Sequence, residues 1–483
     1  MKKTIVLLIF SVIFSVTNAN EIDNLAFANQ NRNKALCADE VFLRRTFIVL
    51  TGRLPDVETT RQFLTSKETG KRSLLIDKLL NSDEFVAYQV LRWGDILRIK
   101  SEFPSNLWPN AVQAYNRWLR EQIKANTPYN IFVRELLLAQ GSNFKAPAVN
   151  FYRAFLKKTP ENVYENINLL FLGNRSVKDE GYRCFSQVKY KSTKEWKEEI
   201  VYVDFLLSPQ KENIRMPDKK ILELKEGSDW RTAYVDWLTS DQNHRFASMM
   251  ANRMWYWIMG AGIVHEPDDW GEHNPPANQK LLDYLTKQFI QSGYDMKAFY
   301  KMVLNTTAYQ SNATPDGYFV SQRIPAEVFV DVLADLTGIS DTYRSRVPEP
   351  FTIYPAGTRS VDLGDATVSS SALELFGRAS RDVSLESQRN SMLTARQLLY
   401  LMNSSELEER IRKSEILNKI CSEKKELKGI CTEITLMTLA RYPSAEEIAL
   451  FQQYAKTNKL SLRNLASDIL WTQINSSEFI FIR

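Results

Sequence analysis

Apolar residues recur at helical spacing through most of this chain, and no other feature constrains the fold as strongly. The segment DWRTAYVDWL (229–238) puts its large apolar residues on one face of a helix, and NQKLLDYLTKQFI, PAEVFVDVLADLTG and SAEEIALFQQYA repeat the pattern. Strand-like runs are few: EEIVYVDFLL around Ile200 and FTIYPAG around Ile353. We therefore expect an all-α, multi-helix protein with at most a few short strands and two helical lobes.

Two polar stretches predict the domain boundaries. SPQKENIRMPDKKILELKEGS (208–228) is a candidate linker, and a long segment rich in Pro, Gly and Ser (344–370) is either a functional loop or surface irregularity. These boundaries divide the chain into an N-terminal helical domain, a C-terminal helical domain and C-terminal helical hairpins. The predicted bounds are 20–207, 229–405 and 406–483.

The chain begins with a sequence typical of a secretory signal peptide. Two lysines precede an apolar run that ends near Val16, and the small-residue motif Thr17-Asn18-Ala19 follows. The run is short for a membrane span, although an uncleaved anchor is the alternative. No later segment is long and apolar enough to span a membrane. We expect a signal peptide at 1–19 and a periplasmic or secreted protein that is not a transmembrane protein.

The charge balance argues against a nucleic-acid partner. The chain has 62 basic and 57 acidic residues, a net charge of +5, and loss of Lys2 and Lys3 would lower it to about +3. Basic runs such as KYKSTKEWKEE are interleaved with acidic residues. We predict no binding to nucleic acid.

The four cysteines suggest disulfides, because an exported chain can form them. Cys421 and Cys431 flank a short polar segment and could join a helical hairpin, and Cys37 with Cys184 is a second candidate pair. No Cys-x-x-Cys motif occurs, so the chain lacks the ligands of a cysteine zinc site or an attached c-type haem. We predict no metal and no cofactor.

A weak internal repeat links the two ends of the chain. RLPDVE (53–58) and RYPSAE (441–446) share Arg-x-Pro-x-x-Glu between two helical segments. Proline ends the first helix, and Asp56 or Ser444 can cap the second, Ser444 with Glu447 as a capping box. These motifs predict similar helical hairpins, which could pack together.

A second motif, Asn-Ser/Thr-x-x-Phe/Tyr, occurs three times. It appears in LNSDEF (80–85), LNTTAYQ (304–310) and INSSEF (474–479). We expect the asparagine to adopt the left-handed conformation that ends one helix, and the hydroxyl to cap the next.

Much of the chain resembles a known family. FLRRTFIVLTGRLP, LRWGDILR and LLFLGNR are similar to the first of two paired domains of unknown function, PSCyt and PSD, found in exported planctomycete and verrucomicrobial proteins. NRMWYWIMGAGIV, DDWGEHNPP and FGRASRDVSLESQR resemble the second. The resemblance implies an exported helical protein, often with a cytochrome c or carbohydrate-binding module and often encoded beside sulfatase-like proteins. It implies no established activity.

The chain departs from the family pattern at its cysteines. Where typical members have Cys-x-x-Cys-His, this chain has Gly181 to Phe185 with only Cys184, and where they have Cys-x-Cys-Glu-Arg, SLESQR leaves only Arg389. A redox or haem role shared with relatives is therefore not expected.

The stretch HEPDDWGEHNPP (265–276) is the richest in potential ligands, with two of the three histidines and four carboxylates. Its spacing matches no zinc or calcium motif. In a structural interpretation, Asn274 caps the next helix, Pro275 starts it, and Asp268 and Asp269 face its positive end. The alternatives are a loop that contacts a ligand or partner, and a metal or catalytic site.

Three further residues complete the candidate site. Trp270 is the best candidate for stacking on a sugar, whereas the other tryptophans nearby are expected in helix contacts. Arg253 and Arg389 could pair with Asp268 or Asp269, or bind a sulfate or carboxylate group of a glycan.

Two functional hypotheses follow. The first is an exported, non-redox helical protein that binds an envelope protein or a surface polysaccharide. The alternative is an extracytoplasmic enzyme that acts on glycans, sulfated ones included, through the Asp-rich loop. The sequence shows no nucleophile elbow, phosphate-binding loop or dinucleotide fingerprint.

Overall fold

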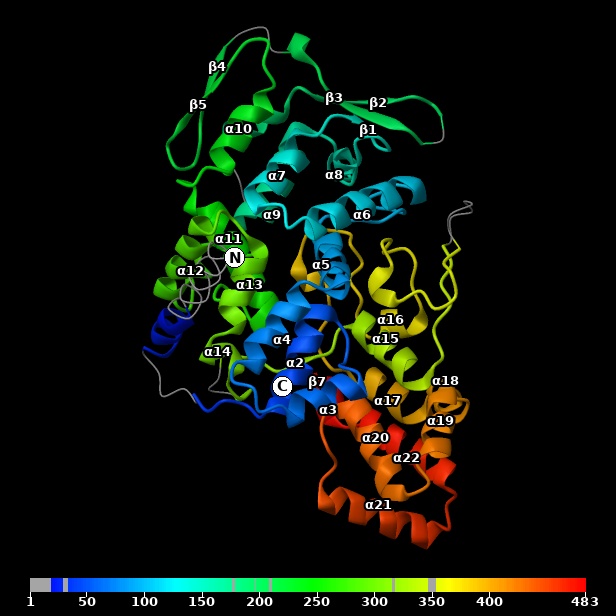
Figure 1. Ribbon diagram of the computed structural model, residues 1–483. Coiled ribbons are helices and arrows are strands. Elements are labelled where there is room, and N and C mark those ends of the chain that lie inside the picture. Colours follow the sequence, from blue (N-terminus) through cyan, green and yellow to red (C-terminus); the bar gives the residue numbers. More distant parts are fainter. Residues whose placement is uncertain are drawn as a thin grey trace, which may run out of the picture.

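The computed structural model describes residues 19–28, 34–175, 179–195, 197–207, 211–314, 318–345 and 353–483. These residues are mostly helical, with short strands in small sheets (Figure 1), which confirms the predicted all-α class. The predicted signal peptide lies outside the described residues, except for Ala19.

The first half of the chain forms the centre and one end of the molecule, the upper end in Figure 1. Residues 19–27 are helical and precede α2. The helices that follow are α2 (Asp39–Thr51), α3 (Val57–Thr65), α4 (Lys71–Leu80), α5 (Asp83–Ile96), α6 (Pro109–Lys124), α7 (Tyr129–Leu138), η1 (Pro147–Val149), α8 (Asn150–Arg153), α9 (Pro160–Leu172), η2 (Glu180–Phe185) and η3 (Phe205–Leu207).

Two small sheets lie at the upper end of the molecule in Figure 1. One has the order β1–β3–β2, with β1 (Gly141–Ser142), β2 (Val188–Ser192) and β3 (Glu199–Val203), and β3 is the strand expected around Ile200. The other is a hairpin of β4 (Glu212–Arg215) and β5 (Ile221–Leu224).

The segment predicted as a linker is therefore a folded hairpin. Within the described part of 208–228, Ile214 and Leu224 are fully buried against the neighbouring helices. Its strands alternate exposed and buried residues, which is the two-residue period of a half-buried strand. The many polar residues are the outward-facing half of that pattern, so the composition alone does not predict the hairpin.

The second half begins with helices that pack against the first half. They are α10 (Trp230–Leu238), α11 (His244–Met259), α12 (Gln279–Gln291), α13 (Met296–Leu304), α14 (Thr307–Gln310), α15 (Ala326–Thr337), η4 (Ser360–Asp362), α16 (Ser371–Leu375) and η5 (Glu386–Gln388). Of the strand expected around Ile353, the described residues, from 353 on, form only an isolated bridge, between Ile353 and Arg344.

The last part of the chain forms helices at the opposite end of the molecule, with α21 lowest in Figure 1. They are α17 (Ala395–Asn403), α18 (Ser405–Arg412), α19 (Glu415–Glu423), α20 (Leu427–Leu439), α21 (Ala445–Asn458), α22 (Leu462–Ile474) and α23 (Ser477–Ile480). The final strand β7 (Phe481–Ile482) pairs with β6 (Gln322–Arg323).

The predicted helix caps are present. Asp56 caps α3, and Ser444 with Glu447 forms a capping box on α21. The hydroxyls of the second motif cap α5, α14 and α23 in the same way.

The asparagines of that motif are not left-handed, contrary to expectation. Asn81, Asn305 and Asn475 have φ of −101°, −85° and −81°. Each side-chain amide instead donates a hydrogen bond to the carbonyl four residues earlier, at 2.7–2.9 Å. The amide thus satisfies a helix-end carbonyl without a change of backbone conformation.

The repeat also carries an ion pair. Arg53 Nη1 lies 3.2 Å from Glu84 Oε1, and Arg441 Nε lies 2.8 Å from Glu478 Oε1. In both copies, therefore, the arginine of Arg-x-Pro binds the glutamate of the following Asn-Ser-x-Glu-Phe. The two hairpins also meet, because α3 packs against α20 and Arg61 pairs with Glu433.

A single hydrophobic core runs through both halves of the described chain. The ends of the chain contribute to it together. Arg44 in α2 donates hydrogen bonds to the carbonyls of Phe479 and Phe481, and Arg45 donates to the carbonyl of Arg483. These bonds hold the last residues against one of the first helices.

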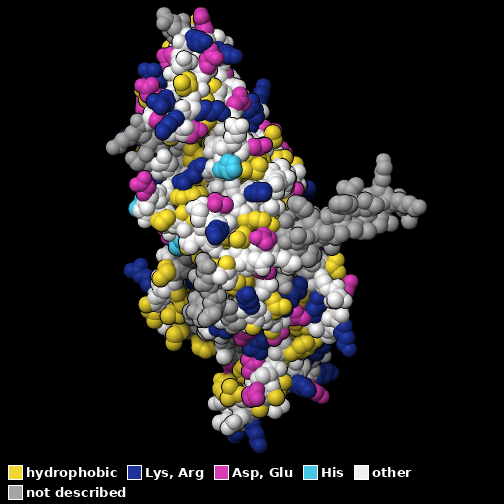
Figure 2. All heavy atoms as spheres, turned by 90° about the vertical axis from the view of Figure 1, so that its left-hand side faces the viewer, with side chains coloured by type: hydrophobic (Ala, Val, Ile, Leu, Met, Phe, Trp, Pro, Cys, Tyr) yellow, Lys and Arg dark blue, Asp and Glu magenta, His cyan; other side chains and the backbone are white. Residues whose placement is uncertain are grey.

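The surface carries both charge signs. On the face drawn in Figure 2, Lys and Arg side chains are interspersed with Asp and Glu. Within the described ranges, no helix combines the length and the apolar character needed to cross a membrane.

Candidate functional site

A buried cluster of charges brings together three of the predicted site residues. Arg253 on α11 is fully buried, and its Nη2 lies 2.7 Å from Asp268 Oδ1. Asp268 is 2% exposed, and its Oδ2 accepts a hydrogen bond from the backbone N–H of Glu386. The sequence prediction that Arg253 pairs with an aspartate of the loop matches this geometry.

Arg389 lies in the same cluster but has other partners. Its Nη2 is 2.6 Å from Asp95 Oδ2, and its Nη1 is 2.5 Å from Glu327 Oε2. Asp95 also binds Arg381 at 2.9 Å, and Glu327 also binds Arg378 at 3.3 Å. Arg389 therefore joins α5 to α15 rather than contacting Asp268 or Asp269.

Two glutamates of the cluster have shifted pKa values. Burial and the neighbouring Asp268 raise the pKa of Glu386 to about 7, although Arg253 and Arg92 oppose the shift. Burial also acts to raise the pKa of Glu327, but the ion pair with Arg389 outweighs it and lowers this pKa to about 2. The same buried cluster thus holds one carboxylate that titrates near neutral pH and one that stays ionised.

Next to Glu386 there is a small cavity of about 40 Å³. It is lined by side chains of both halves of the chain, including Arg92, Asp95, Tyr256 and Arg389. A cavity of this size admits a few water molecules but not a sugar ring. The cluster is a closed electrostatic junction rather than an open substrate site.

The rest of the Asp-rich loop is held by hydrogen bonds and packing. Asp269 Oδ1 lies 3.3 Å from Arg175 Nε and 3.2 Å from His273 Nε2. The Arg245 guanidinium covers the Trp270 ring at 3.7 Å, so this indole face is occupied. The loop therefore does not form one open cleft of Arg253, Asp268, Asp269 and Trp270.

Asn274 does not cap the following helix. Its amide donates to the carbonyl of Asp269 at 2.8 Å, and α12 begins at Gln279 with Asn278 as its cap. Two prolines and an alanine separate Asn274 from that cap, so the chain reaches the helix one turn later than expected. Asn274 closes the loop on itself instead.

All four cysteines are free, and neither predicted disulfide forms. The Cys421 thiol on α19 points to the carbonyl of Leu462, whereas Cys431 is buried in α20. Cys37 lies beside α14, and Cys184 is enclosed by the helices around η2, where burial raises its pKa to about 12. The four cysteines therefore lie in different parts of the structure: Cys37 just before α2, Cys184 in η2, and Cys421 and Cys431 on successive helices.

No group of three or more His, Cys, Asp or Glu side chains in the described ranges is arranged to hold a metal ion. The carboxylates of the cluster are paired with arginines instead.

Other residues of the cluster escaped the sequence prediction, among them Asp95, Glu327, Arg378, Arg381 and Glu386. Asp95 and Arg381 lie within segments that carry the family resemblance, LRWGDILR and FGRASRD, and this was the available signal. Charged residues inside apolar helical segments, such as Asp95 in α5 and Glu327 in α15, were a second signal.

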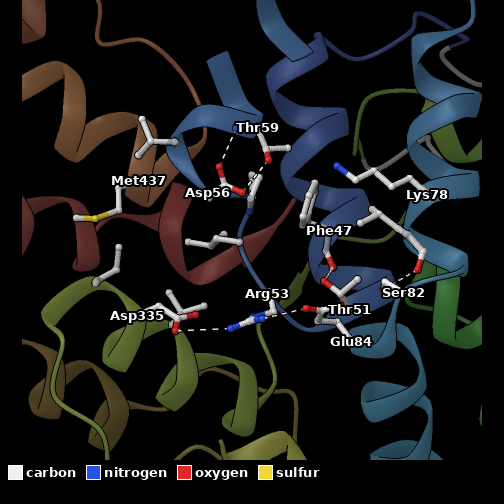
Figure 3. Close-up of a pocket in the computed structure, with 16 residues that line it drawn as sticks. Phe47, Thr51, Arg53, Asp56, Thr59, Lys78, Ser82, Glu84, Asp335 and Met437 are labelled. Carbon is white, nitrogen blue, oxygen red and sulfur yellow. Dashed lines mark hydrogen bonds and ion pairs between the residues drawn. The ribbon is translucent and has the colours of Figure 1, made fainter. Parts of the chain in front are cut away.

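A large open cavity lies elsewhere (Figure 3). It has a volume of about 530 Å³ and lies between the α2–α3 turn, α4 and α5 on one side and α15 and α20 on the other. Apolar side chains form half of its lining: Phe47, Leu54, Pro55, Val57, Leu79, Val332, Leu336 and Met437. The volume is in the range of ligand pockets.

Four of the five charged residues that line this cavity have partners within the protein: Arg53, Asp56, Glu84 and Asp335. The fifth is Lys78. Arg53 reaches Glu84 at 3.2 Å and Asp335 at 4.0 Å (Figure 3). Asp56 accepts hydrogen bonds from the backbone and hydroxyl of Thr59. The cavity therefore offers an apolar surface edged by ion pairs.

Fold and site together define an all-helical protein whose two halves share a buried charged junction and an open apolar cavity. Residues 21–179 match PSCyt2, a protein of unknown function (DUF1549), and residues 230–455 match PSD1, a protein of unknown function (DUF1553). The chain belongs to the family in which these two domains are paired, as the resemblance indicated. No curated protein and no solved structure matches it.

Proposed function

We propose that the protein is exported to the cell envelope and binds a partner protein there through the cavity of Figure 3. The observation that carries this proposal is that both domains build the cavity. The α2–α5 region belongs to the PSCyt2 match, whereas Val332, Leu336 and Met437 belong to the PSD1 match. Pairing the domains in one chain thus creates a binding surface that neither provides alone.

The lining indicates the kind of group that fits. Because most of the rim charges have partners within the protein, a ligand gains mainly from burying apolar surface, about 25 cal/mol per Å². Apolar side chains on one face of an amphipathic helix of a partner protein match this lining. A polysaccharide, whose hydroxyls need free hydrogen-bonding groups, matches it poorly.

Export is supported by the start of the folded region. Ile22 is fully buried, and Asp23 accepts hydrogen bonds from the backbone N–H groups of Thr307 and Ala308. Residues directly after the expected cleavage site at Ala19 thus contribute to the fold, as the start of a mature protein should.

The enzymatic alternative has less support. It relied on Asp268 and Asp269, but Asp268 is buried, with both oxygens engaged by Arg253 and the Glu386 backbone. A general acid or base must reach its substrate, which this geometry prevents for Asp268.

The proposal can be tested by photo-crosslinking in cells. A benzophenone amino acid at Val57, inside the cavity, should form one defined protein adduct, and the same group at the exposed Leu450 on α21 should not. Leu54→Glu should abolish the adduct, because a buried unpaired carboxylate opposes apolar binding. An adduct that is absent, or unchanged by Leu54→Glu in folded protein, would refute partner binding through this cavity.

Export is tested separately, by cell fractionation and N-terminal sequencing. We expect a periplasmic or secreted protein that begins at Asn20. An intact N-terminus in the cytoplasmic fraction would contradict export.

A further inference from the structure

A second open groove, of about 550 Å³, lies between α18 and α22, at the end of the molecule away from the small sheets (Figure 1). Its residues follow helical spacing on both sides: Ser404, Glu408 and Ile411 with Arg412 along α18, and Asn464, Ser467, Asp468 and Trp471 along α22. Met402 and Asn403, at the end of α17, close one side. Two rigid helix faces therefore define the groove.

Trp471 distinguishes this groove from the rest of the surface. Among the described tryptophans it is the one that is exposed, at 39%, while the others are buried or partly covered. Trp270, the tryptophan favoured by the sequence, has an arginine over its ring. A flat, open indole beside a groove provides a platform on which the CH face of a sugar ring can stack.

The polar groups around Trp471 are available to a ligand. In the part of the chain that the structure describes, the side chains of Asn403, Glu408 and Asn464 form no hydrogen bond with the protein. They include both donors and acceptors, which sugar hydroxyls need. The cavity of Figure 3 differs, because most of its rim charges have partners within the protein.

The charges indicate a neutral ligand. Arg412 also lines the groove, where it is bound to Glu409, with Nε 3.0 Å from Oε2, and is attracted by Glu408. The lining thus holds two carboxylates, Glu408 and Asp468, against one arginine. Asp468 Oδ2 accepts one hydrogen bond, from the Tyr454 hydroxyl at 3.2 Å. Two carboxylates would repel a uronate or a sulfate group, whereas they accept hydrogen bonds from uncharged sugar hydroxyls.

We propose that the groove between α18 and α22 binds a neutral saccharide chain, with Trp471 as the stacking platform. Glu408, Asp468, Asn403 and Asn464 bind the hydroxyls. This site is separate from the cavity of Figure 3, so the protein could hold a partner protein and a neutral glycan at the same time.

The test is binding of defined oligosaccharides to the purified mature protein. Cellohexaose and mannohexaose serve as neutral probes, and oligogalacturonate and sulfated carrageenan oligomers as anionic ones, measured by calorimetry and tryptophan fluorescence. We expect binding of at least one neutral probe and weaker binding of both anionic ones. Trp471→Ala should weaken the neutral interaction about tenfold or more, and Trp471→Tyr should retain part of it.

Tyr442→Ala provides the matched control, because Tyr442 is an aromatic residue of similar exposure, 43%, outside the groove. It should leave binding unchanged, and thermal unfolding should verify that all variants fold. The proposal is overturned if neither neutral probe binds, if anionic probes bind more tightly, or if Trp471→Ala binds like the wild type. The Val57 crosslink should persist in Trp471→Ala, so failure of this site and failure of partner binding are distinguishable.

Discussion

At the scale of single residues, the charged junction consists of buried arginine and carboxylate side chains, each of which needs its partner to balance its charge. A buried ion pair contributes little compared with apolar packing, but loss of one partner leaves the other charge uncompensated. Asp268 is the clearest case, because Arg253 is its ion-pair partner and Glu386 lies beside it.

We predict that Arg253→Met lowers the free energy of unfolding by about 3–5 kcal/mol, since it leaves the buried Asp268 without a counterion. Chemical denaturation followed by circular dichroism measures the change. Arg175→Met is the control, because Arg175 also pairs with a loop aspartate, Asp269, but its side chain is 48% exposed. Its effect should be below about 1 kcal/mol, and equal effects of the two variants would show that burial does not matter here.

Glu386 should make stability depend on pH. Its pKa is about 7 in the folded protein, whereas the ordinary value for glutamate is 4.5. As the pH rises from about 4.5 to 7, the unfolded chain releases this proton and the folded protein keeps it, so folding becomes less favourable. Above pH 7 the effect is complete.

Glu386→Gln should remove this pH-dependent loss of folding free energy, which is on the order of 3 kcal/mol at most. The variant should therefore gain stability relative to the wild type between pH 5 and pH 7, measured by denaturant titration at each pH. Burial also raises the pKa of Asp331 to about 6, but this group titrates in both proteins and cancels in the comparison. If the difference in free energy of unfolding between Glu386→Gln and the wild type stayed constant across the pH range, Glu386 would not be the group responsible.

At the scale of elements, most hydroxyl and carboxylate helix caps were predictable, and most long-range contacts were not. The caps by Asp56, Ser82 and Ser444 follow from residues within three positions, and all are present. The junction joins Asp95 to Arg389 across most of the chain, and no local pattern identifies such partners. The β4–β5 hairpin was missed for a different reason, because its outward-facing residues are as polar as a linker.

The free cysteines lead to a prediction about helix placement. The helices keep Cys421 and Cys431 apart, and the predicted partners Cys37 and Cys184 also remain unpaired. Protein purified without reductant and then unfolded should therefore react as four thiols per chain in a dithionitrobenzoate titration. Two thiols or none would show that disulfides form and that the cysteine-bearing segments move.

At the scale of the whole molecule, the two domains behave as one unit. The core is continuous, and both the junction and the cavity of Figure 3 draw residues from the PSCyt2 and PSD1 matches. Hydrogen bonds from Arg44 and Arg45 in α2 to the carbonyls of residues 479–483 join the C-terminal segment to this unit.

Deletion of residues 479–483 should therefore lower the free energy of unfolding by a large part of its value. It removes the buried Phe479, Ile480 and Ile482 and leaves Arg44 without its carbonyl acceptors. We expect a loss of at least about 5 kcal/mol, seen as loss of a cooperative thermal transition. Arg483→Ala keeps the backbone carbonyls and should change stability by less than about 0.5 kcal/mol. A deletion variant as stable as the wild type would contradict a structural role of the tail.

The contact between α2 and the C-terminal residues also bears on the order of folding. Arg44 donates to the carbonyls of Phe479 and Phe481, and Arg45 donates to the carbonyl of Arg483 as well as to those of Tyr309 and Ser311. Segments this far apart in the sequence meet only at a high cost in loop-closure entropy. We therefore expect the core around α2 to close late in folding, after the local helical hairpins have formed.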